Sequence, residues 1–323
     1  MQRRHLMLSL AALPAALTSA ARAQGQPPRI LVGFPAGGSV DTTARRFAEF
    51  ARGKLAETVL VEQKVGAGGR IAIGGLKDAA PDGQTLLISP SSMFTIYPHA
   101  YRKLAYNPAT DVVPVAPLAL STCGFGVGPM VPATVKTLAQ LADWFKANPD
   151  KAAYASPAAG AMPHFLGNQF ERAAGLKLTH AAYRGAAPGM QDLMGGQIAS
   201  GCFSIGDFLP HLASGRVRLL GVTDKARSRF APDVPTFEEQ GFKGIVGVES
   251  YGLFVPARTQ QALVDKLADL ARGAVREPAV VEALAKLGFE PLSLPPSDYG
   301  KRLAAEREYW GPVVKASGFS SDD

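Results

Sequence analysis

The sequence contains little that could support covalent or metal chemistry. Among its 323 residues are only two cysteines, which excludes a disulfide-rich scaffold and a thiolate metal cluster. The five histidines never occur at the H-x-x-x-H spacing of a helical zinc site, and there is no Cys-x-x-Cys pair. We therefore expect neither a metal ion nor a cofactor.

Signatures of enzymes are missing as well. No G-x-S-x-G nucleophile elbow occurs. No glycine-rich loop has the Lys-Ser/Thr ending of a phosphate-binding loop or the G-x-G-x-x-G spacing of a dinucleotide site. The one pairing of nucleophile and base that the pattern allows is Ser156 with His164, which leaves a periplasmic hydrolase as an alternative. We expect a protein without catalytic residues.

The positive charge of the chain is not concentrated anywhere. There are 34 lysines and arginines against 27 aspartates and glutamates, a formal net charge of +7. These basic residues are scattered, and no cluster of basic and aromatic side chains occurs. The composition therefore does not indicate a nucleic-acid partner.

The first 23 residues have the composition of a secretory signal. Arg3 and Arg4 precede an apolar run, 6–17, and an A-R-A pattern ends at Ala23, with no acidic residue in this segment. The run is too short to span a bilayer, and no later apolar run is long enough. We expect cleavage near Ala23, which leaves 7 − 3 = +4, and a periplasmic product that does not span a membrane. The arginine pair does not decide between general and twin-arginine export.

Short apolar runs alternate with helical patterns along the rest of the chain. The first part has the order β-α-β-α-β, which predicts a mostly parallel sheet covered by helices. A second unit of the same kind begins near Thr122. After it, one strand pattern, 251–255, is followed by three helical patterns with no new parallel strands to cover, and we expect these helices to pack back onto the first unit. The strands expected in the two units are 30–34, 58–62, 85–89, 122–127, 152–155, 180–183, 198–204 and 217–223.

These patterns predict an α/β protein of two lobes. Residues 24–121 and 236–323 form the first lobe, and residues 122–235 form a second lobe inserted into it. The chain then crosses twice between the lobes, which gives a hinge of two segments. Two lobes joined in this way typically close on a ligand held in the cleft between them.

The segment Pro35–Asp41 is a candidate cradle for an anion. It lies where the first strand ends and a helix begins, and its glycines let backbone N–H groups approach a ligand at the positively polarised helix N-terminus. Ser39 or Asp41 is suited to cap the first helical turn. A tight turn without a ligand accounts for the same residues, so both interpretations stay open at this point.

Two loops of the second unit have the same character. Ser156–Ala161 and Tyr183–Ala187 each follow a predicted strand and precede a helix, and their small residues expose backbone donors. Tyr183 and Arg184 add a hydroxyl and a cation, unless Arg184 is a solvated surface residue. His164, in the first turn of a helix, is either a capping residue or a ligand donor.

The two cysteines, Cys123 and Cys202, each lie on a predicted strand of the inserted unit. In an oxidising compartment they either form a disulfide, which we expect, or remain two buried thiols. Peptide mapping under non-reducing conditions distinguishes the two.

Seven collinear motifs together resemble the Bug-type extracytoplasmic solute-binding proteins, the receptor components of tripartite tricarboxylate transporters. They cover essentially the whole chain after the signal, and each alone is short. The motifs are F-P-A-G-G-S-V-D (34–41), V-E-Q-K-V-G-A-G-G (61–69), P-D-G-Q-T-L (81–86), Y-R-G (183–185), D-L followed by G-G-Q (192–197), P-D-V-P-T-F-E-E (232–239) and a closing helix with Glu306 and Trp310.

This resemblance implies a type II-like periplasmic binding protein, a monomer that closes on a small carboxylate and presents it to membrane subunits of a transporter. The same fold could instead serve as the ligand-binding accessory of a membrane sensor kinase. The resemblance places the ligand-binding residues on both lobes. They are Phe34, Ala36, Gly37, Gly38, Ser39, Asp41, Ser89 and Ser91 on the first lobe, and Ser156, Gly160, Ala161, His164, Tyr183, Arg184 and Gly185 on the second.

The chain departs from the family pattern at several positions. Ala36, Gln63 and Gln84 stand where the family usually has Pro, Asn and Tyr. Acidic residues often follow the G-G-Q motif in the family, and here Ala199 and Phe203 hold those places. The loss of acidic groups there argues against an amino-acid ligand and favours a plain or aromatic carboxylate.

Overall fold

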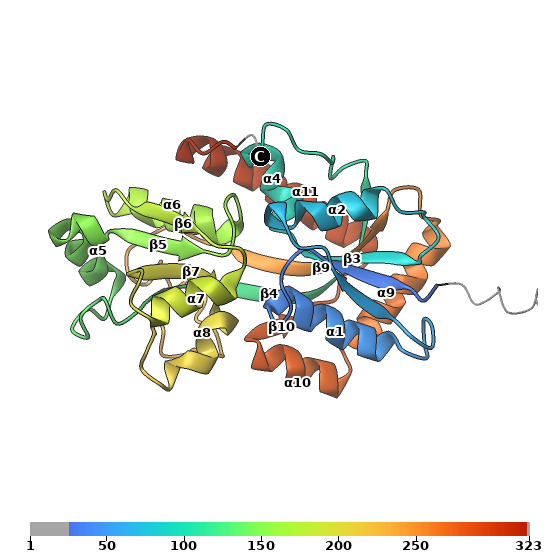
Figure 1. Cartoon of the computed structure of the whole chain (residues 1–323), viewed down its shortest axis with the longest axis horizontal. Coiled ribbons are helices and arrows are strands. Elements are labelled where there is room, and N and C mark those ends of the chain that lie inside the picture. Colours follow the sequence, from blue (N-terminus) through green and yellow to red (C-terminus); the bar gives the residue numbers. More distant parts are fainter. Residues whose placement is uncertain (1–25, 322–323) are drawn as a thin grey trace, which may run out of the picture.

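The computed structural model describes residues 26–321 (Figure 1). The predicted signal, residues 1–23, lies outside this range. Within it, no helix combines the length and the apolar character needed to cross a membrane. The described chain forms two α/β lobes, which lie side by side in Figure 1.

The first lobe has the predicted β-α-β-α-β order. Strand β1 pairs in parallel with both β2 and β3. The apolar face of α1, with Val40, Ala44 and Phe47, packs on this sheet. Its elements are β1 (Arg29–Val32), α1 (Ser39–Ala51), β2 (Leu60–Gln63), α2 (Arg70–Lys77), β3 (Thr85–Pro90), α3 (Ser92–Thr95) and α4 (Tyr97–Ala100).

The second lobe repeats this construction. Strand β5 pairs in parallel with β6 and β7, and helices cover the sheet. Its elements are α5 (Leu138–Ala147), β5 (Ala153–Ser156), α6 (Met162–Ala173), β6 (Thr179–Ala182), α7 (Ala186–Met194), β7 (Ser200–Ser204), α8 (Ile205–Leu212) and β8 (Arg218–Val222).

Two long strands, β4 (Val112–Val127) and β9 (Val248–Pro256), join the lobes. They run antiparallel to each other, and β4 continues past β9 to pair with β7 and β8 of the second lobe. The resulting order, β2-β1-β3-β9-β4-β7-β5-β6, makes one sheet of the two halves (Figure 1). Only the last part of β4 was expected to be a strand. Pro114 and Pro117 obscure its start, and the register shifts beside each of them, as bulges around proline do.

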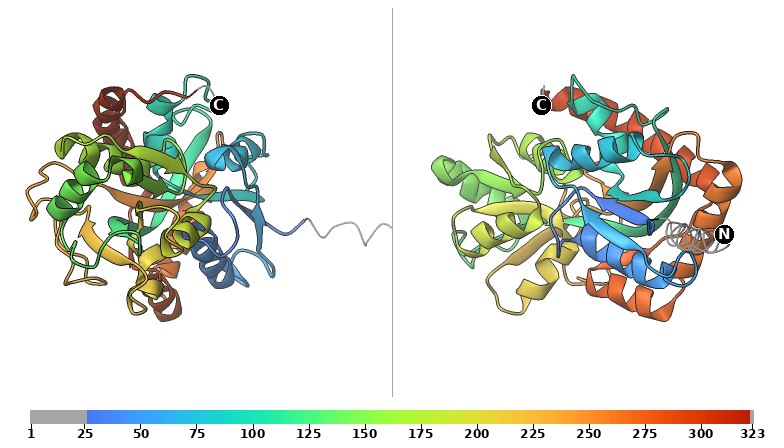
Figure 2. Two further views of the ribbon diagram at one scale, coloured as in Figure 1. Left: turned by 60° about the vertical axis from the view of Figure 1, so that its left-hand side comes forward. Right: turned by 45° about the vertical axis from the view of Figure 1, so that its right-hand side comes forward.

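The C-terminal helices pack mainly on the first lobe. Residues Val264 and Leu267 of α9 share a core cluster with Val40 and Phe47 of α1. The right-hand view of Figure 2 shows these helices, in orange and red, around the blue elements of the first lobe. The segment comprises α9 (Gln261–Ala274), α10 (Pro278–Lys286), β10 (Phe289–Pro291) and α11 (Pro296–Ser317).

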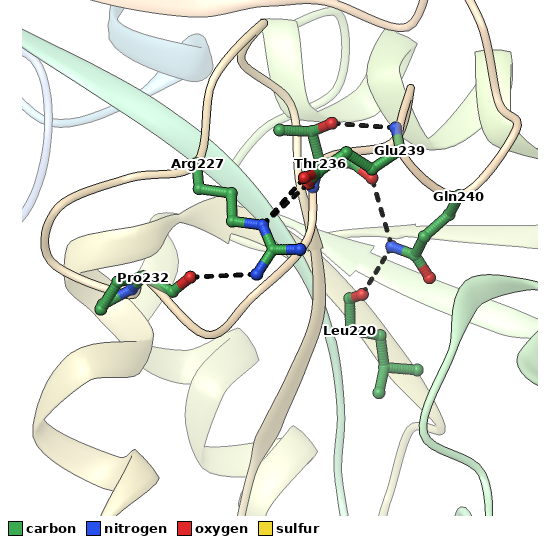
Figure 3. A network of polar contacts seen from close by, with 6 residues as sticks. All are labelled: Leu220, Arg227, Pro232, Thr236, Glu239 and Gln240. Atoms are coloured by element: carbon green, nitrogen blue, oxygen red, sulfur yellow. Dashed lines mark hydrogen bonds and ion pairs between the residues drawn. The ribbon is translucent and has the colours of Figure 1, made fainter.

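The P-D-V-P-T-F-E-E motif is a structural turn (Figure 3). The Thr236 hydroxyl accepts a hydrogen bond from the backbone N–H of Glu239. In return, the Glu239 carboxylate accepts hydrogen bonds from the backbone N–H of Thr236 and from the Arg227 side chain. Phe237 packs its ring against Phe125 and Phe170 of the second lobe. Residues 236–247 thus contact second-lobe elements, and we propose that the return to the first lobe begins at β9 instead of at residue 236.

Thr236→Ala is expected to lower the free energy of unfolding by about 1 kcal/mol, because it removes the hydroxyl that caps this turn. Thr236 is buried, so water cannot replace the lost acceptor fully. Urea unfolding measures the effect, and Thr110→Ala in an exposed turn is the matched control. Equal unfolding curves for the two variants would show that the turn is not held by this contact.

Cys123 and Cys202 are free thiols, and both are buried. They lie on neighbouring strands, but Cys123 pairs with Ser204 and Cys202 pairs with Phe125. Diagonal neighbours of this kind lie farther apart than the Cβ separation that a disulfide requires. The structure therefore has two buried thiols and not the disulfide that we expected.

Candidate functional site

A cavity of about 100 Å³ lies between the lobes. Both lobes and both hinge strands contribute to its wall, which is mostly apolar with a few polar groups, as in many sites for small molecules. The residues predicted from the sequence that line it are Phe34, Ala36, Gly38, Ser39, Ala161, Arg184 and Gly185.

The loop after β1 forms one side of this cavity. Gly37 has a φ of +82°, which suits glycine, and Gly38 precedes α1 in an extended conformation. The Asp41 side chain is buried and does not line the cavity. It accepts hydrogen bonds from the Gly37 N–H at 2.9 Å, from Arg45 at 2.9 Å and from Gln63 at 2.5 Å. Burial alone would raise the pKa of Asp41, but these bonds lower it, so the ionised carboxylate fixes the loop.

Four helices of the described chain begin at the cavity. The residue that precedes each first turn lines the wall: Gly38 for α1, Ala161 for α6, Gly185 for α7 and Ser204 for α8. None of these four residues caps its helix with a side-chain hydrogen bond. Backbone N–H groups at helix N-termini carry partial positive charge, so their convergence favours an anion.

The hinge strands form the floor of the cavity. Ser121 of β4 pairs with Glu249 of β9, and its hydroxyl lies 2.5 Å from that of Ser204 in β7. Cys123 and Tyr251 also line this floor. A ligand that touches the floor therefore touches the segments that connect the lobes.

Two acidic residues of the cavity wall were not predicted from the sequence. Asp207 lies in the first turn of α8, and its carboxylate is 3.5 Å from the Ser39 hydroxyl of the first lobe. Glu249 accepts from the Ser91 hydroxyl at 3.0 Å and from the Ser92 N–H at 2.7 Å. Burial raises the pKa of each carboxyl to about 7, although the hydrogen bonds from the serines act in the opposite direction. Neither residue belongs to a motif, and only the fold brings them together.

Several predicted residues instead support the wall from behind. Ser91 holds Glu249, as described above, and Ser89 bonds to the Pro90 carbonyl and the Met93 sulfur. Gly160 has a φ of +75° and donates its N–H to His164 Nδ1 at 3.1 Å. His164 therefore fastens the loop that precedes its own helix, and it does not line the cavity.

Ser156 does not pair with His164. Its hydroxyl lies 2.7 Å from His180 Nε2, and His164 stacks on His180 with ring centroids 3.8 Å apart. Burial lowers the pKa of His164 to about 3, with a further contribution from His180, and lowers that of His180 to about 4. Neither histidine nor Ser156 lines the cavity, so this group has no access to a substrate there.

A second hollow of about 420 Å³ continues the cleft beyond Phe34 and Pro35. Tyr183, another of the predicted residues, lines this hollow together with the glycine loop of residues 66–69. The Tyr183 hydroxyl donates a hydrogen bond to the Asp192 carboxylate at 2.7 Å. Burial is the main cause, and the Asp192 carboxylate the second cause, of a rise in the pKa of Tyr183 to about 12. Arg184 and Gly185 border both hollows, so they mark the passage between them.

The model of the tripartite tricarboxylate transporter family receptor, TctC, matches residues 43–319. The chain belongs to this receptor family. The receptor is 31% identical over 310 residues to protein BugT of Bordetella pertussis, with 94% of this chain and 93% of BugT covered. The family confirms the resemblance to the Bug-type proteins, which are binding proteins and not enzymes.

Solved structures agree with the two-lobed fold of the receptor. The periplasmic binding protein BugD has a TM-score of 0.85 and 31% identity, with 91% of this chain and 98% of that chain covered. Rpa4515 of R. palustris with adipate has a TM-score of 0.87 and 25% identity, with 92% of this chain and 99% of that chain covered. MatC of Rhodopseudomonas palustris with bound malate has a TM-score of 0.83 and 28% identity, with 89% of this chain and 98% of that chain covered.

Proposed function

We propose that the receptor is a periplasmic protein that captures a small organic acid as its carboxylate in the cavity between the lobes and presents it to the membrane subunits of a tripartite transporter. The observation that carries this proposal is the convergence of four helix N-termini without side-chain caps on one cavity. The similar proteins with adipate and malate support the same class of ligand.

The cavity has enough donors for useful affinity without a buried cation. A hydrogen bond to a charged ligand is worth about 1.5–3 kcal/mol. Several first-turn N–H groups acting together therefore reach the roughly 8 kcal/mol of micromolar binding. Arg184 is exposed and borders the cavity, so it adds attraction at the entrance.

The lobes also touch each other through residues outside the cavity wall, which supports closure on the ligand. The Tyr101 hydroxyl of the first lobe donates to the Ala159 carbonyl of the second at 2.9 Å. Arg229 of the second lobe pairs with Glu290 of β10. A transporter can recognise such a closed form because its surface differs from that of the open form.

A thermal-shift screen of carboxylic acids with ligand-free protein tests the proposed function. We expect stabilisation that grows with ligand concentration for at least one acid, because a ligand that binds only the folded chain raises its stability. No shift with any mono-, di- or amino-carboxylic acid would contradict the assignment of the ligand class.

Gly38→Val is expected to weaken carboxylate binding at least tenfold. The Gly38 backbone is extended, and a Cβ built there meets only the Pro35 carbonyl, at 3.6 Å, so valine fits without strain and its methyl groups enter the cavity. The stability of the ligand-free chain should fall by about 1 kcal/mol, because valine is a poorer residue than glycine at a helix N-cap. Gly74→Val is the control, since a Cβ at Gly74 has no atom within 4 Å. Undiminished binding by Gly38→Val would place the ligand elsewhere.

A further inference from the structure

We propose that the cavity selects a carboxylic acid that also carries an amino group, and that Asp207 and Glu249 are the residues that select it. This inference rests on the proposed function, since it concerns the same cavity. It names the substrate class more narrowly than a small organic anion.

The two carboxyls flank one floor. Both carboxyls line the cavity. The negative charge of each adds to the effect of burial in raising the pKa values of Cys123 and Tyr251, which belong to that floor. Glu249 is 5% exposed, and its Oε1 accepts hydrogen bonds from the Ser91 hydroxyl and the Ser92 N–H. The Ser92 side chain is a further hydrogen-bond partner, so every protein group that bonds to this carboxyl is neutral.

Within residues 26–321, no cation is among the groups that act on these two carboxyls. Ser39 and the backbone N–H of Ser204 act on Asp207, and Ser91 and Ser92 act on Glu249, all of them neutral groups. Glu306 of α11 adds further negative charge near Glu249, and Arg302 pairs with Glu306 instead of with Glu249. Arg184 is the one cation among the described residues that line the cavity.

The cavity is therefore bipolar. The N-termini of α6 and α7 and Arg184 make the second-lobe wall favourable for a carboxylate. Glu249 on the floor and Asp207 on α8 disfavour a second carboxylate when they are ionised, because like charges in a site of low dielectric repel strongly. An ammonium group beside either acidic residue forms the charge-assisted hydrogen bonds that an apolar or anionic group cannot form.

This inference revises the expectation drawn from Ala199 and Phe203. The absence of acidic groups at those two positions argued against an amino-acid ligand. The fold supplies acidic groups from other elements, Asp207 from the start of α8 and Glu249 from hinge strand β9. A ligand ammonium that binds Glu249 thereby contacts the hinge directly.

Calorimetric titration with matched acids tests the selection. Adipate and 5-aminopentanoate each have four methylene groups, and succinate and 3-aminopropanoate each have two. Within a pair, one end of the molecule is a carboxylate in both acids, and the other end is a carboxylate in one acid and an ammonium group in the other. The twenty common amino acids and dicarboxylates of three to seven carbons are screened beside them. We expect the tightest ligand to be an amino-bearing acid, at least tenfold tighter than its matched dicarboxylate.

Glu249→Gln and Asp207→Asn keep the shapes of the side chains and remove their charges. In each variant we expect the preference for the amino-bearing acid to fall at least tenfold, with dicarboxylate binding retained or improved. Glu171→Gln is the control and should keep the wild-type preference. Glu171 lies on α6 and accepts a hydrogen bond from the Leu178 N–H.

A wild-type preference for dicarboxylates, or a preference that neither variant changes, would overturn this inference and leave the proposed function intact. Absence of binding by every acid in both sets would overturn the proposed function itself. The two failures are therefore distinguishable within one set of titrations.

Discussion

Gly206→Ala is expected to lower both the stability of the receptor and its affinity for ligand. Gly206 lies at the start of α8 in the second lobe, and a Cβ built there would overlap the carbonyl group of Leu287, which follows α10 in the first lobe. Backbone atoms cannot rotate away, so α8 or α10 must move. Overpacking of this kind costs about 3 kcal/mol, and it displaces the neighbouring Asp207 from the cavity.

Gly74→Ala is the matched comparison for this variant. A Cβ at Gly74 of α2 meets nothing within 4 Å, and alanine in a helix is favoured over glycine, so stability should rise by about 0.5–1 kcal/mol. Denaturant unfolding and calorimetric titration of both variants measure the two effects. Wild-type stability and affinity in Gly206→Ala would show that the lobes do not approach each other at Leu287.

The free energy of unfolding is expected to change little between pH 7 and pH 4, because two pairs of buried groups titrate with opposite signs. The pKa values of Asp207 and Glu249 are raised to about 7, so the folded chain holds protons that unfolded carboxyls release above about pH 4, and stability rises as the pH falls. The pKa values of His164 and His180 are lowered to about 3 and about 4, so below pH 6.5 the unfolded chain binds protons that the folded chain does not, and stability is lost as the pH falls.

Two double variants separate these contributions. The Asp207→Asn, Glu249→Gln variant retains only the histidine pair and should lose roughly 5 kcal/mol between pH 7 and pH 4. The His164→Gln, His180→Gln variant retains only the carboxyls and should gain stability over the same range. Urea unfolding at pH 7, 5.5 and 4 measures both. If both variants follow the wild type, the four groups do not titrate as their burial implies.

Much of the fold could be predicted because local patterns determine it. The strand and helix order of both lobes follows from short apolar runs separated by glycine and proline turns. The sixteen residues of β4 were less predictable, since Pro114 and Pro117 argue against a strand when no partner is known. Their place beside β9 depends on pairing between segments more than a hundred residues apart, which no local pattern contains.

The candidate site was predictable where backbone geometry makes it. Glycines and small residues end strands at the cavity, and the residues that line it there are Phe34, Pro35, Ala36, Gly38, Ser39, Ala161, Arg184 and Gly185. The roles of Asp41 and His164 were different, since hydrogen bonds within the protein already use their side chains. Asp207 and Glu249 carried no signal in the sequence, because a single acidic residue gains meaning only from the groups that surround it.

Native mass spectrometry of the receptor purified without denaturation tests the central claim most directly. We predict a complex of one chain with one small carboxylic acid, retained from the host or added after dialysis, that dissociates to a free chain on activation. The Gly38→Val variant, purified in parallel, should carry no such ligand. A chain that binds no carboxylic acid under either condition, or a variant that retains the same ligand equally well, would contradict the account.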